Sequence, residues 1–217
     1  MDYEYFKAIP WCSRILEDSD VVLFTPPCRL KPDQNGYCPT QDQLVRKTLF
    51  NDDGIPHVVA FHSRIGSESQ AASAPSAGLR FLINSSTLLL HLRPGLNGYN
   101  GGAHGGLIGT LIDEAMGTLI FQNHEVYKAW EEEGKAIPPN VLNMHGLALF
   151  TARMTVRYEK PIATPGIVLV TASLDKIEGR KVQLKVVVRD EKDAVLARGD
   201  GLWISVPQTS VPAMNKL

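Results

Sequence analysis

A glycine-rich stretch with one histidine and two acids is the part of this sequence best suited to chemistry. It reads GGAHGGLIGTLIDEAMG and runs from Gly101 to Gly117. Glycine lets the backbone adopt unusual dihedral angles and approach a ligand closely. If a helix begins near Gly105, its first amides have no intrahelical acceptor and carry the positive end of the helix dipole. Such amides can bind an anion or a polarised carbonyl oxygen, although a plain connecting turn explains the glycines equally well.

Asp113 and Glu114 interrupt a run that is otherwise apolar. A carboxylate inside an apolar helix costs several kcal/mol unless it is paired or faces a cavity. Gly105 and Asp113 would lie about 12 Å apart along a helix, too far for one substrate atom to contact both. Antiparallel helices of a two-fold dimer would place Asp113 of one chain beside Gly105 of the other, which predicts an active site shared between subunits. The alternative is that both acids face solvent or form structural hydrogen bonds.

The elements that position these residues follow from hydrophobic periodicity. The run from Leu107 to Gln122 is apolar on nearly every face, which predicts a buried helix. The polar segment from Asn123 to Asn140 is expected to form a short surface helix and a loop. Four strand-like segments with short connections follow, and we expect them to form an antiparallel meander. They cover residues 147–161, 167–177, 181–190 and 194–206.

The first 100 residues are less regular. A short amphipathic helix is expected near the N-terminus, and residues 54–65 and 79–92 have strand character. The serine- and alanine-rich segment between them, residues 66–78, is expected to be a flexible connection. Together the elements favour an α+β class, in which an antiparallel sheet wraps around one buried helix. The expected divisions are an N-terminal extension over 1–53, the main domain over 54–206 and a tail over 207–217.

Composition excludes several classes of protein. The chain has 217 residues, 44% of them hydrophobic, and a formal net charge of -1, which does not suit nucleic acid or an anionic membrane. No apolar run approaches the ~18 residues of a membrane span, and the mixed, acidic N-terminus does not read as a secretory signal. Three cysteines without histidines at ligand spacing favour neither disulfides nor zinc. We therefore expect a cytoplasmic protein with no metal, cofactor, nucleic-acid partner or membrane span.

Several segments resemble one known family. HGGLIGTLIDEAMG resembles the His-Gly-Gly…Asp signature of the hot-dog-fold acyl-CoA thioesterases, in their PaaI-like branch. FTARMTVRYEKPIATPG and KIEGRKVQLKVVVRDEKDAVLARGDGLW are similar to the strands that close that fold. FKAIPWCSRIL and KTLFNDDGIPHVVAF resemble the N-terminal extension of fungal members of the group. The resemblance covers most of the chain and is best from Leu96 to Val206.

The resemblance implies a hot-dog fold, at least dimeric, that hydrolyses the thioester of an acyl-CoA or of a carrier-bound acyl group. On matching positions, the amide of Gly105 would donate to the thioester oxygen, and His104 would help to shape that pocket. Asp113 would act from the partner subunit as general base on water or as nucleophile. Thr151 matches the hydroxyl that orients the water or the carboxylate. Whether dimers pair into tetramers stays open.

One position departs from the family pattern. Related enzymes often carry a polar residue six positions before the histidine, where this sequence has Gly98. Asn97 or Asn100, close by, is expected to substitute in substrate binding. The basic hairpin turn at Arg180 and Lys181 is expected to contact the phosphates of coenzyme A, with a solvated turn as the alternative. Gly106 and Glu114 are two further candidates for substrate contact.

Two other functions compete with thioester hydrolysis. The first is a non-hydrolytic step, such as isomerisation, dehydration or cyclisation, on a polyketide-like or acyl intermediate. The same fold hosts several chemistries, so fold alone cannot decide between them. The second is a non-catalytic domain that binds a partner, against which the combination of Gly105, Asp113 and Thr151 argues.

Overall fold

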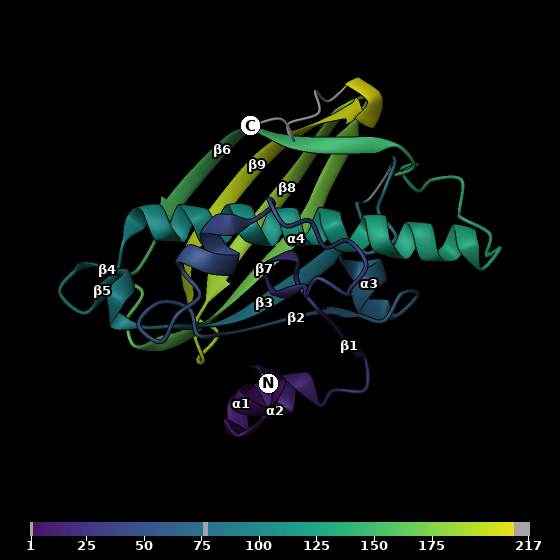
Figure 1. Ribbon diagram of the computed structural model, residues 1–217. Coiled ribbons are helices and arrows are strands. Elements are labelled where there is room, and N and C mark those ends of the chain that lie inside the picture. The colour runs from purple at the N-terminus through teal and green to yellow at the C-terminus, as the bar shows by residue number, and fades with distance from the viewer. Residues whose placement is uncertain (1, 76–77, 211–217) are drawn as a thin grey trace.

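A seven-stranded antiparallel sheet curves around one long helix in the computed structural model, which describes residues 2–75 and 78–210 (Figure 1). The strand order across the sheet is β1-β2-β3-β7-β8-β9-β6. A small separate ribbon pairs β4 with β5. The α+β arrangement expected from the sequence is confirmed. The strands are β1 (Val21–Phe24), β2 (His57–Ser63), β3 (Ser85–Leu92), β4 (Asn97–Tyr99), β5 (Gly102–Ala103), β6 (Leu147–Tyr158), β7 (Gly166–Glu178), β8 (Lys181–Arg189) and β9 (Val195–Pro207).

The long helix α4 (Gly105–Glu132) lies against the inner face of the sheet and forms the centre of the core. Leu111, Ile112, Met116 and Leu119 are fully buried on this face of the helix. They pack against strands whose side chains alternate between the two faces of the sheet. In β8, for example, the buried residues are Val182, Leu184, Val186 and Val188. No helix in residues 2–75 and 78–210 is long and apolar enough to cross a membrane.

The helix is longer than the sequence indicated. We expected a separate surface helix after Gln122, and this expectation is wrong, because α4 continues without a break to Glu132. Asn123 and Tyr127 stay buried on the face that packs on the sheet. The side chain of Asn123 accepts from the amide of Ile83 and donates to its carbonyl oxygen, both at 2.9 Å. These bonds hold the polar half of the helix in place.

The connection between β2 and β3 is also more ordered than expected. It contains a short helix, α3 (Glu68–Ala72), capped by the hydroxyl of Ser67. Gln70 is buried, accepts from the amide of Asn84 at 2.8 Å and donates to the carbonyl of Ser85 at 3.2 Å. The connection thus contains a short helix that the sequence analysis did not predict, while residues 76–77 lie outside the described part.

The N-terminal extension contributes to both faces of the sheet. Helices α1 (Asp2–Lys7) and α2 (Pro10–Leu16) pack on the outer face, where Phe6 joins a second core with Val59, Phe61 and Leu89. The segment between β1 and β2 crosses α4 (Figure 1) and contains the short turns η1 (Pro27–Arg29) and η2 (Leu44–Thr48). Val45 from this segment belongs to the main core. The extension is thus packed into the same sheet and core as the rest.

Strand β6 does not sit where the sequence placed it. We expected it to begin a four-strand meander, but only β7, β8 and β9 form one, and β6 pairs with β9 at the sheet edge. The chain after β6 bends beneath the start of α4, where Ala163 bridges to Gly102, and delivers β7 to β3 instead. After β9 comes the turn η4 (Gln208–Ser210), and the rest of the expected tail lies outside the described residues.

Candidate active site

The N-terminus of α4 is capped by the histidine that precedes it. His104 has extended backbone angles, and its Nδ1 accepts from the amide of Gly106 at 2.9 Å. Its own amide donates to the carbonyl of Leu96 at 2.9 Å. The cap therefore engages the amide of Gly106, whereas that of Gly105 has no acceptor within the described ranges. Gly105 presents the donor that is free for a ligand.

The residues before the helix pack tightly around this cap. A Cβ at Gly98 would lie 2.6–2.9 Å from atoms of His104, so a larger residue at Gly98 would displace the histidine. Asn97 accepts a hydrogen bond from the hydroxyl of Thr164, which is buried. Asn100 is exposed at the tip of the β4–β5 ribbon. Both asparagines are exposed, but the side-chain oxygen of Asn97 is engaged within the chain, whereas Asn100 has no such contact among the described residues.

Asp113 and Thr151 are in direct contact. Thr151 Oγ1 donates to Asp113 Oδ1 at 2.9 Å, which joins the middle of α4 to β6. Asp113 is half-buried at this contact. Glycines lie one helical turn before and after it, and a Cβ at Gly109 would already reach within 3.8 Å of Met154 on β6. Gly109 therefore faces β6, whereas a Cβ at Gly117 would lie 3.8 Å from Trp203 on β9.

A β-bulge in β6 brings Thr151 to this face. The pairing of β6 with β9 shifts register between Thr151 and Arg153, so that Ala152 is the extra residue. A bulge reverses the alternation of side chains along a strand. Thr151 before the bulge and Met154 after it therefore both face α4, although three positions separate them.

Tyr158 is a residue of this region that sequence reasoning missed. Its hydroxyl donates to the carbonyl of Gly105 at 3.0 Å, while the ring stays 55% exposed. The contact fixes the first turn of α4 against the last residue of β6. The only signal in the sequence is the position of Tyr158 an even number of residues after Met154, which puts both on one face of the strand.

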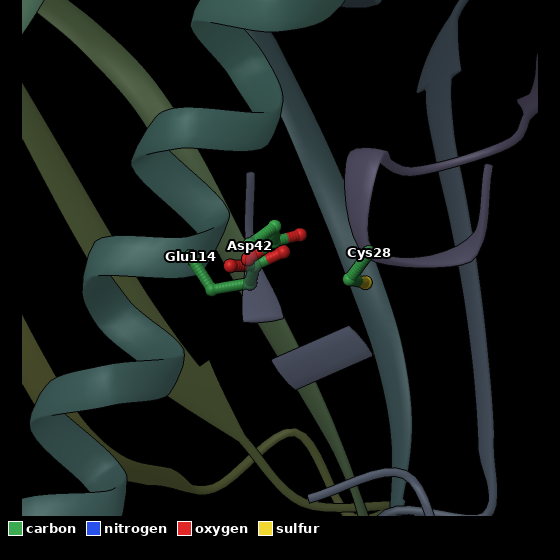
Figure 2. A group of neighbouring side chains, drawn as sticks. All are labelled: Cys28, Asp42 and Glu114. Atoms are coloured by element: carbon green, nitrogen blue, oxygen red, sulfur yellow. The ribbon is translucent and has the colours of Figure 1, made fainter. Parts of the chain in front are cut away.

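Glu114 lies apart from Asp113. Its side chain points from α4 toward Asp42 and Cys28 of the extension (Figure 2). Burial, followed by the charge of Asp42, raises the pKa of Glu114 to about 8. The structure therefore does not bring Glu114 to the Asp113 side of the helix, where the sequence analysis had grouped it with substrate-binding residues.

The basic turn between β7 and β8 is separate from the helix N-terminus. Arg180 Nε donates to the carbonyl of Ser205 at 2.9 Å, which fixes the turn to the end of β9. Lys181 is exposed and precedes Val182, which is buried against the core. Because neighbours on a strand alternate, Lys181 points to the outer face of the sheet. Within one chain, neither residue reaches the amide of Gly105.

Residues 100–197 match the family model described as the thioesterase superfamily. This region is similar to that superfamily, and the sheet wrapped on a central helix is the hot-dog fold that the sequence resemblance implied.

Two curated relatives differ in how much of the chain they match. The chain is 30% identical over 115 residues to the acyl-coenzyme A thioesterase THEM4 of Bos taurus, covering 52% of this chain and 38% of that protein. It therefore spans less than half the length of that relative. It is 28% identical over 211 residues to verlamelin biosynthesis protein B of Lecanicillium sp, covering 94% of this chain and 87% of that protein.

A solved structure is also similar. It is a hypothetical thioesterase protein with coenzyme A from Streptococcus pneumoniae TIGR4, 14% identical, with a TM-score of 0.45. The likeness covers 58% of this chain and 83% of that one.

Proposed function

We propose that this protein hydrolyses the thioester bond of an acyl-CoA, or of an acyl group on a carrier. The observation that carries the proposal is the 2.9 Å hydrogen bond from Thr151 to Asp113, on the same helix whose first amide, at Gly105, is open to a ligand. The superfamily match over residues 100–197 and the THEM4 relative support the same reaction class.

The reaction needs one oxyanion donor and one base. The amide of Gly105 donates to the thioester oxygen and stabilises the charge that develops there. Asp113 accepts a proton from water as the water oxygen attacks the carbonyl carbon. The tetrahedral intermediate then collapses, the carbon–sulfur bond breaks, and the leaving thiolate takes up the proton. Thr151 keeps the carboxylate of Asp113 aimed at the water.

We propose that the two halves of each site come from two chains. Asp113 lies two turns along α4 from Gly105, about 12 Å away at the usual helical rise. Strand β6 forms one edge of the sheet and is mostly exposed, with Phe150 47% and Tyr158 55% accessible. An edge strand offers unpaired backbone groups to another strand. Antiparallel pairing of two β6 strands would set the two α4 helices side by side in opposite directions.

The first experiment compares wild type with Asp113→Asn and Asp113→Ala. Free thiol release is followed with a panel of short, long and aromatic acyl-CoAs. We expect kcat/KM to fall at least 100-fold in both variants, because the base is lost. Asp52→Asn, in an exposed loop, is the matched control and should keep full activity. Absence of thiol release by folded wild type from every substrate would refute hydrolysis.

Gly105→Pro tests the oxyanion donor. Proline at the first helical position fits the helix and removes only the amide hydrogen, and the extended ψ of 137° at His104 suits a following proline. Gly105→Ala keeps the amide and is the control. We expect Gly105→Pro to lose about 100-fold in kcat relative to Gly105→Ala, the range for one oxyanion donor. Equal activity of the two variants would assign the donor elsewhere.

A non-hydrolytic step on an acyl or polyketide-like intermediate is the second candidate. The match over 94% of the chain to a protein named for verlamelin biosynthesis favours it. The same assays distinguish the two. Hydrolysis releases free thiol, whereas isomerisation, dehydration or cyclisation without release leaves the thioester intact, with a changed acyl group visible by mass spectrometry.

We further propose that the catalytic domain spans residues 54–206, and that the protein works in the cytoplasm. All three cysteines, Cys12, Cys28 and Cys38, are free thiols in the structure. A reducing compartment keeps thiols in this state.

A further inference from the structure

Three acidic groups from separate parts of the chain meet beside α4 (Figure 2). Cys28 belongs to η1, Asp42 precedes η2, and Glu114 lies on the first half of α4. One donor atom from each residue lies within 4.8 Å of the other two. The cluster is separate from the contact between Asp113 and Thr151, because Glu114 leaves α4 on a different side.

One oxygen of each carboxylate in this cluster lacks a partner. Within residues 2–75 and 78–210, Glu114 Oε1 and Asp42 Oδ2 are inaccessible to solvent and accept no hydrogen bond. Cys28 is only 1% exposed. A buried carboxylate without a partner is costly, so these oxygens require a proton or a cation. Burial raises the pKa of Cys28, Asp42 and Glu114 alike.

We propose that Cys28, Asp42 and Glu114 bind a zinc ion. A thiolate with two carboxylates is a mixed sulfur and oxygen donor set, which zinc accepts and which magnesium or calcium, as oxygen-seeking ions, do not favour. Donors around tetrahedral zinc lie about 3.3–3.8 Å from one another, given bond lengths of about 2.0–2.3 Å. Side-chain adjustments of about 1 Å would close the set observed here.

The charges around the cluster suit a zinc complex with three anionic ligands. A thiolate and two carboxylates around a divalent ion leave one net negative charge. Arg29 and Arg46 supply positive charge nearby, and both lower the pKa of Asp42, against the larger effect of burial. Arg29 and Arg46 also line, with Cys28, a surface cavity of about 780 Å³. Zinc binds the deprotonated forms of its ligands, so its affinity should rise with pH.

Such an ion would tie the extension to the central helix. Two of its ligands come from the segment that crosses α4, and the third comes from α4 itself. Zinc that binds only the folded chain stabilises it by mass action. The inference does not depend on thioesterase activity, since Asp113 and Gly105 take no part in the cluster.

Measurements of metal content and of thermal stability test the proposal. The full chain is kept reduced and is first freed of bound metal with a chelator. After dialysis against zinc, we expect one zinc per chain by elemental analysis. A hundredfold excess over Kd should raise Tm by about 5–10 °C. Cobalt(II) in place of zinc should give the near-ultraviolet charge-transfer absorption of a cobalt–thiolate bond.

Variants assign the ligands. Cys28→Ser should abolish the cobalt–thiolate absorption, while Cys38→Ser, at a half-exposed thiol, should leave it unchanged. Glu114→Gln and Asp42→Asn keep the side-chain shapes and should fold, as circular dichroism would verify, but lose the rise in Tm with zinc. The proposal is overturned if wild type takes up no stoichiometric zinc, or if the absorption follows Cys38 and not Cys28. In that event a shared proton joins Asp42 and Glu114.

Discussion

Asp113 and Glu114 are consecutive residues of α4, and about 100° of helical rotation separates their side chains. That rotation directs Asp113 to the hydroxyl of Thr151 on β6 and Glu114 to Asp42 and Cys28 on another side of the helix. Two acids that look alike in the sequence therefore have different neighbours. One has a hydrogen-bond donor and partial access to solvent, whereas the other has a buried oxygen without a donor.

Removal of the Thr151 hydroxyl should weaken catalysis without unfolding the protein. Thr151→Val deletes the donor to Asp113, and a hydrogen bond to a charged group contributes about 1.5–3 kcal/mol. We expect kcat to fall about tenfold or more with little change in Tm, because Thr151 is exposed. Thr155→Val, exposed on the same strand, is the control. Steady-state kinetics with an accepted acyl-CoA measure the effect, and equal rates for both variants would contradict a role for Thr151.

Buried His62 should make stability depend on pH. The ring is 4% exposed, its Nδ1 donates to the carbonyl of Ser63 at 2.8 Å, and its Nε2 has no partner in the described part. Burial lowers the pKa of His62. Between that lowered pKa and the usual value near 6.5, the unfolded chain binds more protons than the folded one. Stability therefore rises with pH through this window, and the contribution of His62 is lost as pH falls from about 6.5 to the lowered pKa.

Urea unfolding at pH 5.5 and 7.5 checks this dependence. The free energy of unfolding should drop less on acidification in His62→Gln than in wild type. His145→Gln removes an exposed histidine, and its free energy of unfolding should drop on acidification as much as that of wild type does. Identical drops for wild type and His62→Gln would show that His62 does not control acid stability.

At the scale of elements, two glycines of β9 let α4 lie close to the sheet. A Cβ at Gly199 would overlap the side chain of Ile112, and one at Gly201 would overlap Met116. We expect Gly199→Ala to cost about 1–3 kcal/mol of unfolding free energy, the usual cost of overpacking. Gly102→Ala is the control, because the nearest atoms to a Cβ there lie 3.8 Å or more away. Urea unfolding measures the free energy of unfolding of both variants. Equal values for Gly199→Ala and Gly102→Ala would mean that α4 can shift over β9 without cost.

The local pattern of residues predicted where the strands lie better than it predicted which strands pair with each other. The alternation within residues 181–190 placed β8 nearly at its observed bounds, because each second residue there must reach the core. The pairing of β6 with β9 was missed, since alternation does not say which neighbour a strand takes. The bulge at Ala152 was missed for the same reason. The meeting of Cys28, Asp42 and Glu114 joins three segments distant in sequence, and no spacing rule reaches across them.

At the scale of the whole molecule, the sheet has packing on both faces and one open edge. The extension packs against both α4 and the outer face of β2 and β3, and adds β1 beyond β2. The opposite edge is β6, which carries both Thr151 and Tyr158. The candidate active site thus lies along the edge strand that remains free for a second copy of the chain.

Complementation between two inactive variants tests whether the site spans two chains. In a mixed dimer of Asp113→Ala and Gly105→Pro, one site lacks both groups, and the other pairs an intact Asp113 with an intact Gly105. Random exchange of equal amounts makes half of the dimers mixed, so activity should recover to about a quarter of wild type. The measurement is thiol release after unfolding and refolding the two variants together, with each variant refolded alone as control. If both groups of a site came from one chain, mixing would restore nothing, because every chain carries one defect.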